Sequence, residues 1–588
     1  MRRTRLGIAA AVVGALALTA CSSGSSSKTA KDNAGDASKQ QASIPLGTAS
    51  DSTGPATPVA GAKTGGTLNV LQRDSYAHLD PAQIYVSDEG SLATLYSRQL
   101  TTYKVVNGKT TLVGDLATDS GKVSDGGKTW TFTLKDGVKF QDGKQITSAD
   151  VRQSIERMYA SFITDGPTYV QQWLSGTGTE YRKALPDGPY KGKHLPDSVL
   201  ATPDSKTVVF HFLQAEPDAP FALGMAAYGI VEKSKDTQQK YDVAPVASGP
   251  YKIQSFKADK SLVLVKNTAW DPKTDSARHQ YVDKYNITFG HQYSDSTQQL
   301  LSDSDPTAVS FNNTVDPTLT SKVLGDAAAM KRSIAGYQPY VGQYNINMDR
   351  ITDKKVRQAL ALAIPAKTIL ALNGGSTAGA VANSLISPTV SGYDATYDPL
   401  NRKAYPNGNP AEAKKLLKEA GKVGQKIVYA YSNTEIGQKV SVAVSDALKA
   451  AGFTVARKDL DSATYYTLVS KKNNPYDFFA TAWGADWPSA STVVPPLYDG
   501  RQIQDGSSNY SHINVSSINS GIDAANKLTD PAKAAAAWAK LAKEVQNTYA
   551  VTPTFYYKSL QLYGSKVGGV IYNDVIGGVD PTKLYVKN

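Results

Sequence analysis

The segment AWGADWPSA (482–490) combines residue types that suit the binding of an extended peptide. Ala482, Gly484 and Asp486 occupy every second position, so their side chains would point the same way in an extended segment. The edge of such a strand can pair with a peptide backbone, and Gly484 would permit a close approach. A carboxylate in a closed cleft can also form a charge-assisted hydrogen bond, about twice as strong as a neutral one. Because burying Asp486 without a cationic partner would be costly, this carboxylate favours burial only together with a bound cation.

Two tryptophans flank this aspartate. Trp483 and Trp487 have rigid apolar faces that could line pockets for ligand side chains. Either could instead pack in the core beside a strand. Asp486 could instead cap a helix that begins at Pro488. The 33 tyrosines are compatible with an amphipathic cleft, but their number identifies no site.

The single cysteine, Cys21, stands at a position with chemical meaning. It follows residues 1–20, MRRTRLGIAAAVVGALALTA, in which a basic start precedes an uncharged apolar run, as in a secretory signal. That run is too short for a comfortable membrane span. Its end, LTAC (18–21), resembles the lipobox of bacterial lipoproteins, in which the cysteine thiol takes a diacylglycerol. We therefore expect a lipid anchor on Cys21; a conventional signal with an incidental cysteine is the alternative.

The next stretch is expected to be a tether. Residues 22–64 contain no aromatic residue and are rich in Ser, Ala, Gly, Thr, Asp and Lys. Such a composition cannot bury enough apolar surface to offset the loss of chain entropy. We expect a disordered segment over residues 21–64, and a folded part that begins near Gly65 at a random-coil distance from the membrane.

The net charge argues for an envelope surface rather than for nucleic acid. The full chain carries +11, and removal of three signal arginines leaves 11 − 3 = +8. The Lys and Arg residues are dispersed through the sequence, which is typical of a solvated surface facing an anionic envelope. We expect no nucleic-acid partner.

The sequence lacks the common catalytic and cofactor motifs. One cysteine permits no intrachain disulfide, zinc ribbon or iron–sulfur cluster. Neither GxSxG nor HExxH occurs, GKT (108–110) lacks the earlier glycine of a phosphate loop, and GTG (176–178) lacks the third glycine of a dinucleotide fingerprint. We expect neither an enzyme nor a bound cofactor or metal ion. The sequence does not exclude the paired carboxylates of a glycosidase, because such residues come together only in the fold.

Local patterns predict strands and helices in alternation. Alternating apolar residues in TWTFTL (129–134) predict a strand with a buried aromatic face, and the Asp-Gly turns that follow predict a hairpin with residues 138–140. Thr147 and Asp150 then form a plausible capping box for a helix. The residues expected on the buried strand face are Trp130, Phe132 and Leu134.

A second set of patterns predicts a βαβ unit. A helix over 410–420 is marked by Asn409 at its start and Gly421 at its end. Strand 426–431, a helix and strand 453–455 follow, which favours parallel pairing. Without a repeat period or a second low-complexity linker, the chain is predicted to be an α/β protein whose lobes interweave in one compact body.

The segment 114–158, GDLATDSGKVSDGGKTWTFTLKDGVKFQDGKQITSADVRQSIERM, resembles the signature of extracellular solute-binding proteins of the oligopeptide/dipeptide type, family 5, which serve ABC importers. The resemblance continues in order through LDP (79–81), SGPYKI (248–253), LVLVKNTAWDP (262–272), DKKVRQALALAI (353–364), NPAEAKKLLKEAG (409–421) and AWGADWPSA (482–490). It covers nearly everything from Gly65 to the C-terminus.

This resemblance implies a fold and its divisions. The fold is the α/β, two-lobe periplasmic-binding-protein type (class II), with an extra third subdomain and a ligand cleft between the lobes. The implied divisions are lobe I at 65–330 with the extra subdomain at about 101–206, lobe II at 331–555, and a C-terminal return to lobe I at 556–588.

The resemblance also implies a function. In peptide-binding members the aspartate of this motif pairs with the ligand's α-amino group, a role that falls on Asp486. Tyr85, Asn509 and Tyr510 lie near family cleft segments. We expect a monomeric lipoprotein on the outer face of the cell membrane that captures short peptides and delivers them to an ABC permease. The alternatives are another ligand, such as a nickel chelate, a sugar or another cationic solute, or a peptide-sensing surface lipoprotein.

Overall fold

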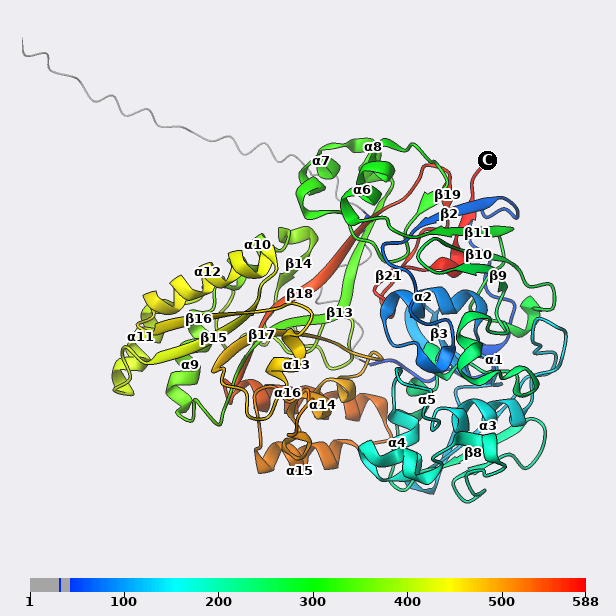
Figure 1. Ribbon diagram of the computed structural model, residues 1–588, viewed down its shortest axis with the longest axis horizontal. Helices are drawn as coiled ribbons and strands as arrows, with labels where there is room; N and C mark the ends of the chain where they lie inside the picture. Colours follow the sequence, from blue (N-terminus) through cyan, green and yellow to red (C-terminus); the bar gives the residue numbers. More distant parts are fainter. Residues whose placement is uncertain (1–30, 33–42) are drawn as a thin grey trace, which may run out of the picture.

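The computed structural model describes residues 31–32 and 43–588. The predicted signal and Cys21 lie outside these residues. Figure 1 shows two halves joined by the long strands β13 and β18. We call residues 333–562 the large-sheet half, and residues 43–332 together with 563–588 the N-terminal half. None of the helices in the described part of the chain is both long and apolar enough to span a membrane.

The large-sheet half is built on one mixed sheet. Its strands, in spatial order, are β14 (Gly379–Val381), β18 (Val551–Leu562), β13 (Ser333–Ile346), β17 (Phe478–Gly484), β15 (Lys426–Ser432) and β16 (Thr454–Leu460), with β1 (Lys31–Asp32) pairing with β13 outside this order. β13 is antiparallel to β17 and β18, whereas β15 is parallel to β16 and β17. The far end of β18 reaches the N-terminal half, where the Leu560 carbonyl accepts a hydrogen bond of 2.7 Å from the Val315 N–H.

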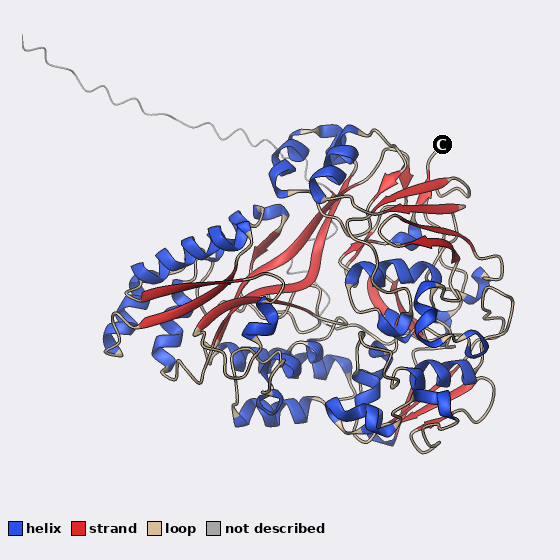
Figure 2. Ribbon diagram, viewed as in Figure 1, coloured by secondary structure: helices blue, strands red, loops and turns tan. Residues whose placement is uncertain are grey.

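Helices cover both faces of this sheet (Figure 2). One set consists of α9 (Lys354–Ala363), α10 (Ala366–Leu372), α11 (Pro410–Glu419) and α12 (Glu435–Ala450), and the other of α13 (Tyr465–Val469), α14 (Val494–Tyr498), α15 (Ser516–Ala525) and α16 (Pro531–Gln546). Successive strand residues alternate between the two cores, since Phe478 packs with the first set and Phe479 with the second. This is the period-two alternation of a sheet buried on both faces.

The predicted βαβ unit is confirmed. β15, α12 and β16 follow one another, and the two strands pair in parallel from Lys426 with Thr454 to Ser432 with Leu460. The preceding helix also begins where expected, because Asn409 Oδ1 accepts the N–H of Glu412 at 3.1 Å.

The N-terminal half contains a five-stranded sheet and the C-terminal strand pairs. The sheet order is β12 (Ala308–Val309), β2 (Thr67–Leu71), β11 (Lys284–Thr288), β10 (Ser261–Lys266) and β9 (Tyr251–Lys257). The C-terminal pairs are β19 (Val567–Gly568) with β22 (Tyr585–Val586) and β20 (Tyr572–Asn573) with β21 (Gly578–Val579). The five-stranded sheet and the C-terminal strand pairs share one core with α2 (Ser87–Tyr96). Three further helices, α6 (Tyr293–Ser302), α7 (Thr320–Gly325) and α8 (Ala327–Lys331), lie beside β13 and β18 (Figure 1). The C-terminal segment thus packs against the five-stranded sheet, which contains β2 from the start of the folded chain.

A four-stranded antiparallel sheet forms the lower part of this half. Its order is β5 (Lys122–Ser124), β6 (Thr129–Thr133), β8 (Thr207–His211) and β7 (Leu200–Ala201). The helices around it are α3 (Ser148–Arg157), α4 (Tyr169–Ser175) and α5 (Ala219–Ala222). The hairpin of β3 (Thr101–Val106) and β4 (Lys109–Gly114) lies nearby. The predicted aromatic face is confirmed, because Trp130, Phe132 and Leu134 are buried in this core. The predicted capping box is confirmed as well, since Asp150 accepts hydrogen bonds from both the N–H and the hydroxyl of Thr147.

The predicted hairpin between 129–134 and 138–140 is wrong. β6 pairs with β5 on one side and β8 on the other, so neither of its edges is available to residues 138–140. That segment instead turns back on itself, with the Phe140 N–H donating to the Lys144 carbonyl at 2.9 Å. The Asp-Gly pairs located the turns correctly, but β5 and β8 pair with the two edges of β6.

The folded body begins before Gly65, which corrects the expected extent of the tether. From residue 43 the chain lies against the N-terminal half: Ile44 is buried in its core, and the Gly47 N–H donates to the Leu112 carbonyl at 2.7 Å. The short helix α1 (Ala49–Ser52) follows. A few small apolar residues are enough to hold this segment in place, because distant parts of the chain supply the core that covers them. The composition of the segment itself does not reveal that core.

Candidate ligand-binding site

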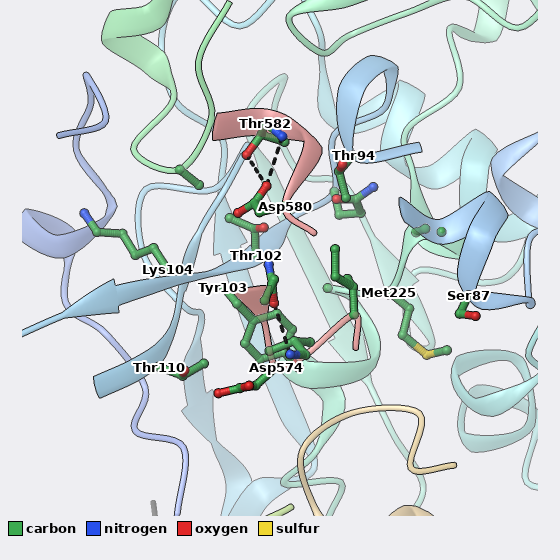
Figure 3. Close-up of a pocket in the computed structure, with 18 of the residues that line it drawn as sticks. Ser87, Thr94, Thr102, Tyr103, Lys104, Thr110, Met225, Asp574, Asp580 and Thr582 are labelled. Atoms are coloured by element: carbon green, nitrogen blue, oxygen red, sulfur yellow. Dashed lines mark hydrogen bonds between the residues drawn. The ribbon is translucent and has the colours of Figure 1, made fainter. Parts of the chain in front are cut away.

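A cavity of about 460 Å³ lies where the two halves meet. This volume is within the roughly 300–1,000 Å³ of typical small-ligand sites. The lining includes segments 84–87, 102–105, 224–227, 276–278, 339–340, 484–486 and 571–576, together with residues near 56, 90–99, 110 and 580–583. Figure 3 shows Thr102, Tyr103 and Lys104 of β3 together with Asp574, Asp580 and Thr582 of the C-terminal segment. Both halves therefore contribute to the wall.

Asp486 enters this cavity directly after β17. Its carboxylate accepts hydrogen bonds from the hydroxyls of Tyr169, at 2.5 Å, and Tyr85, at 3.3 Å. Its backbone N–H donates to Thr492 Oγ1 at 3.2 Å. Burial raises the pKa of Asp486 to about 6, while the two hydroxyls act against this rise. Among the described residues no cation pairs with it, so the carboxylate is held by neutral donors only.

The tyrosines that hold Asp486 come from the opposite half of the molecule. Burial and the nearby carboxylate raise the pKa of Tyr169 and of Tyr85, which keeps both hydroxyls protonated as donors. Tyr169 opens α4, and Tyr85 lies before α2. Asp486 is thus a polar junction between the halves at the cavity wall.

The strand that leads to Asp486 has one edge without a strand partner. On one side β17 pairs with β13 up to Gly484 opposite Tyr340. On the other side β15 pairs only with Phe478 and Phe479, so within the described chain no strand covers that edge beyond these residues. Side chains of α13 occupy part of this edge, because the Tyr465 hydroxyl donates to the Ala480 carbonyl at 2.8 Å and the Tyr466 hydroxyl accepts the Ala482 N–H at 3.4 Å. The edge reaches the cavity at Gly484.

The chain's family follows from its sequence as well as its shape. A model described as bacterial extracellular solute-binding proteins, family 5, matches residues 111–505, about two thirds of the chain. The chain belongs to this family.

Relatives of this family 5 protein support the assignment. The dipeptide-binding protein of Escherichia coli (strain K12) is 26% identical over 356 residues, which cover 57% of this chain but only 59% of that protein. The periplasmic oligopeptide-binding protein OppA of Salmonella typhimurium (strain LT2) is 23% identical over 476 residues, or 78% of this chain and 82% of that one. The solved structure of clavulanic acid biosynthesis oligopeptide binding protein 2 superposes with a TM-score of 0.82 at 25% identity, covering 94% of this chain and 100% of that one. The predicted family and its α/β periplasmic-binding-protein fold are confirmed.

Three of the residues singled out from the sequence line the cavity of this family 5 protein. Asp486 and Gly484 contribute the end of β17, and Tyr85, 48% exposed, faces them from the N-terminal half. The helix-cap alternative for Asp486 is wrong, because the short helix 490–492 is capped by the Ser489 side chain.

The two tryptophans lie away from the cavity wall. Trp487 is 3% exposed and packs against Tyr169 and Trp173, with ring centroids 4.8 and 6.3 Å apart. Trp483 is half-buried in the large-sheet half, where its indole N–H donates to the Thr492 carbonyl at 2.7 Å. Neither side chain is among those that line the cavity.

The other three predicted site residues also lie outside the lining. Ala482 directs its N–H to the Tyr466 hydroxyl at 3.4 Å. Asn509 is buried, and its side-chain N–H groups donate to the carbonyls of Asp499 and Ile513. Tyr510 is buried against Phe479. Sequence proximity to cleft segments therefore did not place these residues on the wall.

Several lining residues carried no recognisable signal in the sequence. Tyr340, opposite Gly484, and Asp574, near the C-terminus, line the cavity, and Tyr169 holds Asp486 from behind. None of the three sits in a motif that predicts binding. The only available hint was the expected return of the C-terminal segment to the first lobe.

Gly484 is required by a close neighbour, which yields a stability prediction. A Cβ added to Gly484 would lie 2.5 Å from Cε1 of Tyr340, well inside contact distance. Gly484→Ala should therefore displace the Tyr340 ring and lower the free energy of unfolding by about 1–3 kcal/mol, as overpacking commonly does. Differential scanning calorimetry measures this as a lower melting temperature.

Gly325→Ala is the matched control, since nothing lies within 4 Å of the Cβ it would add at the end of α7. It should be neutral or slightly stabilising, because alanine is favoured over glycine in a helix. If Gly484→Ala melted at the wild-type temperature, the close contact with Tyr340 would not be a constraint on this position.

Proposed function

We propose that this family 5 protein captures short peptides in the cavity between its halves and delivers them to an ABC importer. The observation that carries the proposal is Asp486, a carboxylate on the cavity wall that is held by two tyrosine hydroxyls and paired with no described cation. A ligand α-amino group would supply the missing positive charge in a charge-assisted hydrogen bond. The names of the relatives, one dipeptide-binding and two oligopeptide-binding, support a peptide as the source of that amine.

The strand edge beside Asp486 supports recognition of the peptide backbone. β17 has no strand partner on one side beyond Phe479, and its last residue, Gly484, lines the cavity. A peptide that extends from Asp486 past Gly484 can form main-chain hydrogen bonds there that do not depend on its side chains. Further along the edge it would have to displace the Tyr466 hydroxyl from the Ala482 N–H. Such binding would tolerate many sequences.

Mass spectrometry of the material released when the purified protein is denatured tests this proposal. Short peptides in the released fraction, and binding of synthetic peptides with a free amino terminus in calorimetric titrations, are expected. A second candidate is a cationic solute that is not a peptide, because Asp486 would suit any amine or similar cation. Release of such a solute, together with no heat of binding from any peptide, would refute peptide capture.

We further propose that the two halves act as the lobes of this binding protein. In that division lobe I is 65–330 with an extra subdomain at about 101–206, preceded by the packed residues 43–64; lobe II is 331–555; and 556–588 returns to lobe I. The long β13 and β18, which connect the halves, support this hinge-like arrangement. Binding in a cleft of this kind should bury the solute by hinge closure. We expect the protein to act as a monomer.

We also propose that a lipid on Cys21 anchors the protein to the outer face of the cell membrane. The support is in the sequence: a basic and apolar N-terminus ends in LTAC (18–21), and the chain contains no other cysteine. An anchored protein keeps captured peptide close to the permease.

Cys21→Ser should abolish this anchoring. Without the thiol no diacylglycerol can be attached, so the protein should appear in the medium or accumulate as an unprocessed precursor. Metabolic labelling with a fatty acid, followed by fractionation, measures both outcomes. Mature Cys21→Ser protein that still carried label and stayed with the membrane would show that the lipoprotein assignment is wrong.

A further inference from the structure

A second carboxylate, that of Asp574, lines the same cavity. Asp574 lies in the turn between β20 and β21, in the C-terminal segment (Figure 3). Its Oδ1 is buried and accepts no hydrogen bond from any described residue. An unsatisfied buried acceptor costs about 1–3 kcal/mol, and more when it is charged. Other buried side-chain atoms of the described residues also lack a partner, but Asp574 Oδ1 is the one carboxylate oxygen among them on the wall of this cavity, where a ligand can supply the missing donor.

The basic residues of the cavity are engaged with other groups. Lys104 donates to the Asp51 carbonyl at 2.8 Å, Lys583 donates to the Ala277 carbonyl, and Arg278 pairs with Asp115 and Asp275. Burial is the cause that raises the pKa of Asp574, to about 6, with no opposing contribution from a nearby cation. At neutral pH the group is therefore mainly ionised, and its charge is uncompensated by the described chain.

The turn itself does not depend on this carboxylate. Asn573 Oδ1 accepts the Val575 N–H at 3.0 Å, and β20 pairs with β21 through Tyr572 opposite Val579. The side-chain hydrogen bond of the turn is thus supplied by Asn573, and Asp574 is left free to face the cavity.

We infer that Asp574 is a specificity-determining residue that pairs with the cationic side chain of a lysine or arginine in the bound peptide. This inference rests on the proposed function, in which Asp486 receives the α-amino group of the same ligand. Three carboxylates line the cavity, and that of Asp580 is bonded to Thr582, so Asp486 and Asp574, one from each half, match a ligand with two positive charges. They also select against acidic ligands by repulsion, and against neutral ligands because the buried Oδ1 of Asp574 would remain without a partner.

Calorimetric titration of matched peptides tests the inference. The probes are short alanine-based peptides with a free amino terminus, in which each position in turn carries lysine or its uncharged counterpart norleucine. The wild-type protein should bind the lysine peptide about tenfold or more tightly than the norleucine peptide at one position at least, as expected for a desolvated charge pair. In Asp574→Asn this preference should fall to nearly equal affinity, while the norleucine peptides bind as before or better.

Asp580→Asn is the matched control. Asp580 lines the same cavity, but its Oδ1 already accepts the N–H and the hydroxyl of Thr582, at 3.0 and 2.6 Å (Figure 3). This variant removes the same charge and should keep the lysine preference. If Asp580→Asn lost the lysine preference as fully as Asp574→Asn, the preference would depend on the net charge of the cavity and not on Asp574. That result would overturn the assignment.

Melting temperatures without ligand separate a binding role from a structural one. Because Asp574→Asn removes an unpaired buried charge, its melting temperature should equal or exceed that of the wild type. A clear decrease would mean that Asp574 stabilises the turn, and would overturn the inference. Wild-type protein that binds peptides without preferring lysine would overturn this inference alone, whereas wild-type protein that binds no peptide would overturn the proposed function and this inference with it.

Discussion

Asp486→Asn should weaken the binding of a short peptide by about thirty- to several thousandfold. Truncating one partner of a buried charge pair typically costs about 2–5 kcal/mol, and asparagine keeps the size of the side chain while removing its charge. Asparagine can still accept hydrogen bonds from the Tyr169 and Tyr85 hydroxyls, so the contact between the halves should persist. Isothermal titration calorimetry of one peptide against both proteins gives the ratio of dissociation constants.

Acetylating the peptide's amino terminus should cause a similar loss, which makes a double-mutant cycle possible. The variant and the acetylated peptide together should cost less than the sum of their separate effects, because both remove the same interaction. Asp461→Asn is the control for net charge, since Asp461 is exposed and lies outside the cavity lining. Additive losses, or tight binding of the acetylated peptide by the unmodified protein, would contradict the role of Asp486.

Trp487→Ala should loosen the contact between the halves. The Trp487 ring leaves the end of β17 and is buried against Tyr169 and Trp173 of α4, within the core of the N-terminal half. Replacing a buried tryptophan by alanine costs about 3–5 kcal/mol in a typical core. Because this contact joins the two halves, we expect a larger radius of gyration by small-angle scattering, and weaker peptide binding, since closure no longer gains this burial.

Trp483→Ala is the control from the same segment. Trp483 packs within the large-sheet half and donates to Thr492 there, so its loss should lower the melting temperature without separating the halves. An unchanged radius of gyration and peptide affinity in Trp487→Ala, or equal expansion in both variants, would contradict the proposed role of Trp487 as an inter-half contact.

Much of the local structure could be predicted from the sequence because its causes lie within a few residues. The capping box of Thr147 and Asp150, the N-cap at Asn409 and the alternation of Trp130 and Phe132 depend on spacings that a short window contains. The same holds for the βαβ unit, whose turn and periodicity signals are all local. Ordered blocks of resemblance then indicated the family from which the arrangement of the lobes could be expected.

Prediction failed where a neighbour distant in sequence decided the outcome. The strand 129–133 has a clear pattern, but β5 and β8 took the edges that the predicted hairpin required. Residues 43–64 look like a tether by composition, yet they pack because other segments cover them. A local sequence pattern indicates which secondary structure a segment can form, but not which segments pack beside it.

The candidate site shows the same division. By itself, the sequence indicated an extended segment in which Ala482, Gly484 and Asp486 take alternate positions; β17 contains the first two and ends before Asp486. Only the tertiary structure decided which groups meet them: Tyr169 and Tyr85 lie 317 and 401 residues away from Asp486, and Asp574 comes from the C-terminal segment. The physical reason is that hydrogen bonds and burial act over a few ångströms, whatever the distance along the chain. Trp487 shows this most simply, since its place in the sequence suggested a ligand pocket and its burial against α4 made it part of the core between the halves.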